Sequence, residues 1–299
     1  MMPILNHIIS FANVPNIDRY LEKCKKAGFH VNQQTVRHAP GKRNGFVNFG
    51  PDYIEFFWVE DTKLFDRKAA AYQKFFRDNP RPFGVAWESK SVDAFHKSAV
   101  RKGFELKPTW SKAMKEAADE KPWWAFQDIP KKYLPGMWSF MLTYLRRDWK
   151  KARTVSIPPN TIYGLTGITF ITNKPEARAR SFQKFLGGKR AGSAVVLGPH
   201  TLKWSTAEAY EKTYGAVKSP RYSGSFDGIQ DVALIHLVAT DLKKAENMLS
   251  SAGFKLSRSE NGFFIKPYKR DGFAFHVTEM LPKRWLKTRA GFGQKIKFM

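Results

Sequence analysis

The chain repeats one pattern four times: an apolar segment, an amphipathic helix that ends at a glycine, and further strand-like segments. The helical segments are YLEKCKKAGFHV (20–31), FHKSAVRKGFEL (95–106), RSFQKFLGGKRA (180–191) and AENMLSSAGFKL (245–256). Each has apolar residues three and four positions apart, as expected of a helix with one buried face. Each then reaches a glycine, where a helix can end in the left-handed conformation. Such a chain is expected to assemble four similar structural units.

The strand-like segments show how the four units are grouped. ILNHIISFA, PFGVAWES, LTGITFIT and DVALIHLVAT precede the helices, and the first and third units share a Gly-Pro turn before an aromatic strand, in GPDYIEFFW (50–58) and GPHTLKWST (198–206). A pair of units has therefore been duplicated. We predict an α+β protein of tandem βαβββ units in two domains, residues 1–150 and 160–299, with the charged, Pro-ending stretch 146–160 as the linker.

One carboxylate stands inside an apolar strand. The segment YIEFFWV (53–59) is rich in aromatic and β-branched residues and is predicted to be a buried strand, with Glu55 at its centre. Burying an ionised carboxylate is costly unless it is paired, hydrogen-bonded or bound to a metal. Glu55 is therefore the first candidate functional residue.

The N-terminal segment resembles the glyoxalase-like domains of the vicinal oxygen chelate superfamily, which includes glyoxalase I, extradiol dioxygenases and bleomycin-resistance proteins. The resemblance covers residues 4–61: a His on the first strand, a helix closing in Gly-Phe, the stretch RHAPGKRN and a YIE strand. It implies that paired units curl into incomplete β-barrels. It also implies that strand residues, here His7 and Glu55, hold a divalent metal (Zn, Ni, Mn or Fe) that polarises the oxygens of a substrate.

The other units depart from this ligand pattern. The residues at the corresponding positions of the second and third units are poor metal ligands: Phe83 or Gly84, Leu142 or Thr143, Gly167 and Lys203. Two protein ligands fall short of the three in typical catalytic zinc sites. His236 and His276 remain metal-capable in the second domain, but the sequence does not bring them together. We therefore expect the site in the first domain and a degenerate second domain.

Three interpretations of His7 and Glu55 stay open. They could bind a metal completed by water, by a partner subunit or by another residue. They could form a metal-free acid–base pair in a cleft. Alternatively, His7 or Arg43 could hold Glu55 in a pocket that has lost its function, since buried carboxylates are commonly paired.

Further pocket residues follow from strand alternation and from one loop. Tyr53, Glu55 and Phe57 share one face of their strand, and we expect Trp87 of the second unit to line the same apolar pocket. His38, Arg43 and Asn44 lie in RHAPGKRN, at the expected mouth of the cleft, where they could receive an anionic or carbonyl substrate. Plain barrel core and solvated loop charge are the alternatives.

Composition bears on three further questions: whether the protein binds nucleic acid, whether it spans a membrane and in which compartment it functions. The net charge of +25 and the acid-free tail 282–299 invite nucleic-acid binding, but no helix-turn-helix, zinc-finger or RNA-recognition signature accompanies them. No apolar run approaches the length of a membrane span, and no secretory leader is evident. The single cysteine, Cys24, fits a reducing cytoplasm.

The sequence thus predicts a cytoplasmic protein that acts on a small molecule, with a homodimer as one way to complete the site. The first candidate function is a glyoxalase-like lyase, isomerase or dioxygenase relative that acts on a small oxygenated molecule. The second is a non-catalytic binder of the bleomycin-resistance kind, and the third is a basic nucleic-acid-associated protein. One fold hosts many chemistries, so the substrate is not specified.

Overall fold

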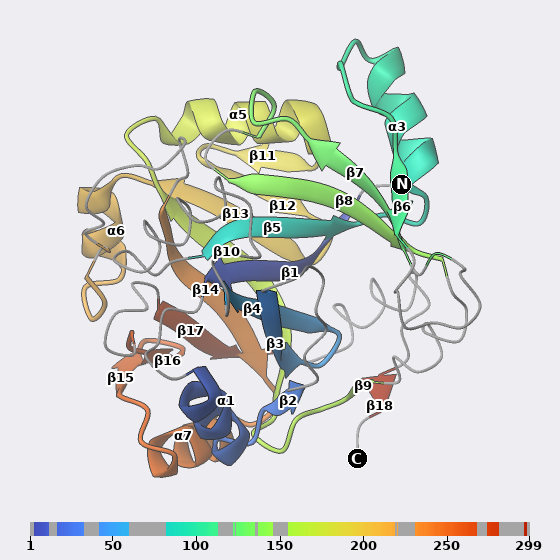
Figure 1. Ribbon diagram of the computed structural model, residues 1–299. Coiled ribbons are helices and arrows are strands. Elements are labelled where there is room, and N and C mark those ends of the chain that lie inside the picture. Colours follow the sequence, from blue (N-terminus) through green and yellow to red (C-terminus); the bar gives the residue numbers. More distant parts are fainter. Residues whose placement is uncertain are drawn as a thin grey trace.

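A computed structural model gives the conformation of most of the chain (Figure 1). It describes residues 3–11, 17–32, 42–59, 82–112, 122, 124–134, 137–145, 155–218, 220, 231–267, 274–280 and 296–297. The loop 33–41 with His38, the segment 62–80, whose sequence predicts a long helix stopped by Pro80, and the basic stretch 146–153 lie outside these residues. No helix in the described part of the chain is long and apolar enough to cross a membrane.

The first eight-stranded sheet contains two βαβββ units. The first unit is β1 (Ile4–Phe11), α1 (Ile17–Lys26), β2 (His30–Asn32), β3 (Lys42–Phe49) and β4 (Asp52–Val59). The second is β5 (Pro82–Glu88), α3 (Val92–Arg101), β6 (Trp110–Lys112), β7 (Trp124–Ile129) and β8 (Trp138–Tyr144). The strand order is β2-β3-β4-β1-β5-β8-β7-β6, with β1 and β5 antiparallel at the centre.

The second eight-stranded sheet repeats this arrangement. Its first unit is β10 (Ile162–Ile171), α5 (Pro175–Leu186), β11 (Lys189–Ala191), β12 (Ala194–Leu197) and β13 (His200–Ser205), followed by α6 (Ala207–Thr213). Its second is β14 (Asp231–Ala239), α7 (Leu242–Ser251), β15 (Leu256–Ser259), β16 (Gly262–Ile265) and β17 (Ala274–Glu279). The order β11-β12-β13-β10-β14-β17-β16-β15 matches the first sheet position by position. The predicted α+β fold of tandem βαβββ units is thus confirmed, and neither sheet closes into a barrel.

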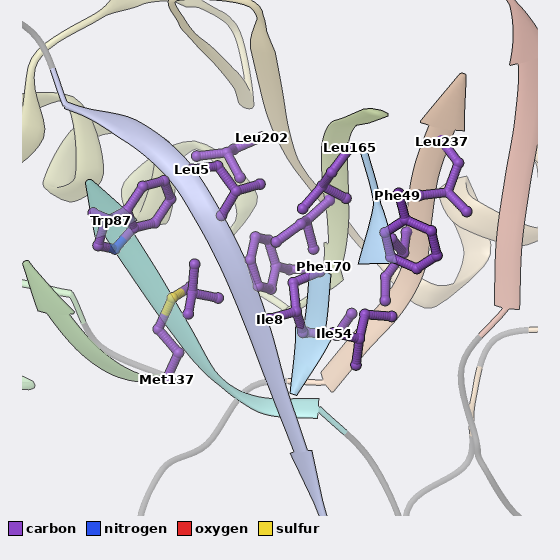
Figure 2. Close-up of a cluster of buried hydrophobic side chains, with 14 of the residues drawn as sticks. Leu5, Ile8, Phe49, Ile54, Trp87, Met137, Leu165, Phe170, Leu202 and Leu237 are labelled. Carbon is purple, nitrogen blue, oxygen red and sulfur yellow. The ribbon is translucent and has the colours of Figure 1, made fainter. Parts of the chain in front are cut away.

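The two sheets share one apolar core. Figure 2 shows side chains of both sheets meeting in it: Leu5, Ile8, Phe49, Ile54 and Trp87 from the first, and Leu165, Phe170, Leu202 and Leu237 from the second. On the opposite face of each sheet lies a separate small cluster, around Phe140 in the first and around Phe264 in the second. We call these opposite faces the outer faces. The sheets therefore pack against each other through their inner faces.

The helices α1 and α7 lie side by side at one end of this pair of sheets (Figure 1). Lys23 of α1 donates to the carbonyl oxygen of Gly253 at 2.9 Å and lies 4.3 Å from the ring centre of Phe254. A small apolar cavity of about 10 Å³ lies nearby, lined by residues of both halves that include Cys24, Phe49 and Leu237. That volume is near the minimum for one water, so the cavity is a packing gap rather than a ligand site.

The two Gly-Pro turns of the sequence meet at the contact between the sheets. Gly50 has a φ of +63°, and a Cβ there would clash with the carbonyl oxygen of Tyr163. Two residues later, the buried Asp52 accepts a 2.9 Å hydrogen bond from the backbone N–H of Leu165. His200, the corresponding residue of the third unit, donates from Nδ1 to the carbonyl oxygen of the same Leu165 at 2.8 Å. Both turns thus hold one segment of β10.

His200 makes the stability of this contact depend on pH. Burial lowers the pKa of His200 to about 3, although its hydrogen bond to Leu165 opposes the shift. The unfolded chain, with a His pKa near 6.5, therefore binds more protons than the folded chain between about pH 6.5 and pH 3. It follows that the free energy of unfolding falls as the pH falls through this window.

Substitution of His200 should reduce this acid sensitivity. We expect His200→Asn, whose side-chain amide can still donate to Leu165, to weaken the pH dependence by up to about 1.4 kcal/mol per pH unit. Urea unfolding of both proteins between pH 7.5 and pH 4.5 measures the two slopes. Equal slopes would mean that His200 does not stay neutral in the folded protein.

Candidate functional site

Neighbouring strands bring His7 and Glu55 together on the outer face of the first sheet. β1 and β4 pair in parallel, with His7 opposite Tyr53 and Ile9 opposite Glu55. His7 Nε2 and Glu55 Oε2 are 3.5 Å apart, and the two side chains are 4% and 11% exposed. The pairing that the sequence resemblance implied is therefore present in the folded chain.

A buried polar relay orients the imidazole of His7. Glu88 Oε2 accepts from Asn6 Nδ2 at 2.7 Å, which directs the amide oxygen of Asn6 toward His7 Nδ1, also at 2.7 Å. The hydroxyl of Tyr144 donates to the same Asn6 oxygen at 3.3 Å. An amide oxygen only accepts hydrogen bonds, so His7 Nδ1 must carry a proton. In the neutral ring, the lone pair is then on Nε2, the atom that faces Glu55.

A bulge in β1 makes this relay possible. The register with β5 shifts between Leu5 and His7, so Asn6 has no opposite residue in β5. A bulge of this kind redirects side chains locally. It lets the side chain of Asn6 reach the ring of the adjacent His7, although strict alternation would place the two on opposite faces.

Asn44 orients the carboxylate of Glu55. The Asn44 amide donates from Nδ2 to Glu55 Oε1, which leaves Oε2 as the oxygen that faces His7. Two lone pairs would repel each other across this gap if both groups were free of protons. The geometry therefore favours one cation between His7 and Glu55, either a proton on one of them or a metal ion.

Aromatic side chains surround the pair. The ring of Tyr53 stacks on His7 with ring centres 4.3 Å apart, and Phe140 meets the His7 ring edge-on at 6.0 Å. Phe46 packs against Tyr53 at 5.6 Å. Tyr53 is only partly buried, so its ring lies between the buried pair and the surface of the outer face. Such a site is mostly apolar with a few polar groups, as small-molecule sites generally are.

The positions of His7 and Glu55 suit two ligands of one metal ion. Ligands about 2.1 Å from a tetrahedral metal lie roughly 3.4 Å from each other, close to the 3.5 Å between Nε2 and Oε2. The Nδ1–H of His7 is held by Asn6, as the second nitrogen of a metal-binding His usually is held. No group of three or more His, Cys, Asp or Glu residues that could hold a metal occurs within the described residues. A metal here would need further ligands beyond His7 and Glu55.

The other predicted site residues either lie elsewhere or fall outside the described part of the chain. Trp87 does not line this face: it is fully buried in the core between the sheets, 5.3 Å from the ring centre of Phe182. The reason is strand alternation, which turns Ala86 of β5 to the outer face and Trp87 to the inner one. Arg43 and Phe57 lie in β3 and β4, but their side chains, like His38, are outside the described part.

The second unit adds support rather than ligands. Thr143, one of the expected ligand positions, donates from its hydroxyl to the carbonyl oxygen of Ser89 at 2.8 Å. The sequence analysis missed Asn6, Glu88 and Tyr144. Glu88 carried a signal similar to that of Glu55, since it is a carboxylate in an apolar strand, although it is the last residue of PFGVAWE. The role of Asn6 became visible only with the bulge.

The comparison with known families agrees with this architecture. A family model described as "Glyoxalase-like domain" matches residues 5–186, which is more than half of the 299 residues. The chain belongs to the glyoxalase-like domain family. The match extends through both units of the first sheet to the end of α5, so it includes the His7–Glu55 pair. No curated protein matches this glyoxalase-like chain.

Several solved structures are similar in fold to this glyoxalase-like protein. A hypothetical protein from Staphylococcus aureus has a TM-score of 0.59 and 9% identity, with 94% of this chain and 100% of that chain covered. A mutant of 4-hydroxymandelate synthase from Streptomyces coelicolor has a TM-score of 0.57 and 12% identity, with 99% of both chains covered. A catechol 2,3-dioxygenase has a TM-score of 0.55 and 12% identity, with 93% and 88% covered. At such identities the likeness concerns the fold alone.

Proposed function

We propose that this protein is a glyoxalase-like lyase or isomerase that moves a proton on a small oxygenated molecule at the His7–Glu55 pair. The main support is the direction of the lone pairs. Asn6 and Asn44 hold the two groups from behind, so that Nε2 and Oε2 face each other at 3.5 Å. A pair that shares one cation is suited to accept and return a proton.

The chemistry of the proposed step depends on the two partners. Glu55 acts as the base that removes a proton from carbon beside a carbonyl group, and protonated His7 stabilises the charge that develops on the oxygen. Asn6 and Glu88 keep His7 in one tautomer throughout, so that only Nε2 changes its protonation. A divalent metal held by His7 and Glu55 would supply Lewis-acid polarisation of the substrate oxygen. Tyr53 and Phe140 exclude water from one side of the reacting groups.

The proposal also covers the cellular compartment and the partners of the protein. The single cysteine favours a reducing compartment, so we place the protein in the cytoplasm. A second copy of the chain is one source of further metal ligands. We give nucleic acid no role in this function, because the described residues of this site carry acids and amides rather than a basic surface.

Proton transfer can be tested without knowing the natural substrate. A panel of dicarbonyl compounds and catechols is incubated with the protein in D₂O, and each compound is followed by proton NMR. An isomerase or lyase of this type should introduce deuterium at the carbon that loses its proton or release a product. Saturable binding of a panel member with no exchange and no product would favour the non-catalytic binder instead.

A further inference from the structure

The outer face of the second sheet carries a cluster of basic side chains at the positions that form the candidate site of the first sheet. Gly167 pairs with Thr201, and Thr169 pairs with Lys203, as His7 pairs with Tyr53 and Ile9 with Glu55. Lys203 therefore occupies the place of Glu55. An ammonium group stands where the first sheet has a carboxylate, so the charge at this position is reversed.

Two histidines that the sequence left apart meet beside this lysine. His236 of β14 and His276 of β17 are directly opposite each other in the sheet, and their ring centres are 5.7 Å apart. Thr169 Oγ1 lies 2.8 Å from His236 Nε2, and Ser259 Oγ lies 2.9 Å from His276 Nε2. The hydroxyls contact the Nε2 atoms, so Nδ1 is the nitrogen of each ring that a ligand would contact.

An aromatic wall closes one side of the cluster. The ring centre of Tyr214 is 6.1 Å from His236 and 6.3 Å from His276, and Lys203 Nζ lies 5.5 Å from the Tyr214 ring. Phe264 stacks on His276 at 4.6 Å. These rings place apolar surface beside the cluster, where electrostatic interactions are stronger than in water.

Within the described part of the chain, the two titratable groups that shift the pKa of His236 are both basic. Burial, together with smaller contributions from His276 and Lys203, lowers the pKa of His236 to about 3. Burial also lowers the pKa of His276. No carboxylate of the described residues offsets these bases in the pKa of His236. Among the residues that the structure describes, the cluster thus has no compensating negative charge.

We propose that the outer face of the second sheet binds a small anion, through a phosphate or carboxylate group, between Lys203, His236 and His276. The ligand supplies the missing negative charge and accepts hydrogen bonds from the lysine and from the Nδ1 atoms. A bound anion favours the protonated imidazoles, so binding takes up protons and becomes tighter as the pH falls. The net charge of +25 attracts anions toward the whole molecule.

The test uses the whole protein with ¹³C-labelled histidine, inorganic phosphate and acetate as probes. The chain has seven histidines, and the signals of His236 and His276 are assigned from single substitutions to Gln. Each anion is added at pH 7 with the ionic strength held constant by sodium chloride. We expect saturable shifts of both signals with at least one probe, and the probe that binds identifies a phosphate or a carboxylate site.

Substitutions of Lys203 distinguish the effect of its charge on anion binding from the effect of its packing. Lys203→Gln should weaken binding at least tenfold, while Lys203→Arg should keep it within about threefold. The matched control is Lys189→Gln, a change at an exposed position of β11, which should leave binding unchanged. Glu55→Gln should also leave it unchanged, because Glu55 belongs to the other sheet.

Two results would overturn the proposal. One is the absence of saturable shifts in the wild-type protein, or the same affinity in Lys203→Gln as in wild type. The other is tighter binding of Zn²⁺ than of both anions at His236 and His276, which would make this face a cation site. Neither result would bear on the His7–Glu55 pair.

Discussion

Replacing Glu55 by glutamine lowers turnover by about 10²–10⁴-fold, the usual contribution of a positioned acid or base, for any panel compound that the protein converts. Glutamine has nearly the shape of glutamate and keeps an oxygen that can accept from Asn44. It cannot take up the proton, however, and it is a poor partner for a cation beside His7. The measurement is the rate of deuterium exchange or product formation, with the melting temperature as the test of folding.

The matched control is Glu105→Gln. The side chain of Glu105 is 84% exposed and is paired with Lys132. It is not part of the candidate site. This variant should keep wild-type turnover. If Glu55→Gln remained fully active, the proton-transfer role would be wrong. In that case Glu55 would be a structural carboxylate held by Asn44.

The largest expected effect on stability comes from Gly50→Ala. Gly50 has a left-handed φ of +63° and lies against the carbonyl oxygen of Tyr163. An alanine there should lose about 1–2 kcal/mol to the strained backbone and about 1–3 kcal/mol to overpacking. We therefore expect a loss of about 2–5 kcal/mol in the free energy of unfolding, measured with urea.

Gly103→Ala isolates the backbone contribution. Gly103 has a similar φ of +82°, but no atom lies within 4 Å of the position that a Cβ would occupy. This variant should lose only the roughly 1–2 kcal/mol of backbone strain. Equal losses in the two variants would show that the contact between Gly50 and β10 adds nothing to stability.

The fold was predictable because each of its units carries a local signal. Four helices are followed by glycines with positive φ, and these are Gly28, Gly103, Gly187 and Gly253. The repeated Gly-Pro turn correctly paired the first and third units. The sequence missed β6 and β7 in the second unit, since Trp110–Lys112 is short and QDI at the end of β7 is not typical of a buried strand. The domain limits 1–150 and 160–299 stay predictions.

The candidate site was only partly predictable. Glu55 was noticeable because its cost of burial is a property of the residue and its strand. The roles of Asn6 and Glu88 depend on a bulge, which shifts the register by one residue and leaves no mark in a pattern of alternating residues. Trp87 was misplaced because an aromatic residue in a strand is equally suited to either face. His236 and His276 are neighbours because β14 pairs with β17. The order of strands in a sheet cannot be inferred from the local sequence pattern of either strand.

The most direct test of the account is the protonation of the two ring nitrogens of His7, measured by ¹⁵N NMR across pH 5–9 with and without Zn²⁺. We predict that Nδ1 keeps its proton throughout, and that only Nε2 loses its proton with pH or shifts on addition of Zn²⁺. Glu55→Gln should remove the response to Zn²⁺ but leave the Nδ1 proton in place. A proton on Nε2 together with a bare Nδ1, and no response to Zn²⁺, would contradict the account, because Nε2 would then have no lone pair to share with a cation.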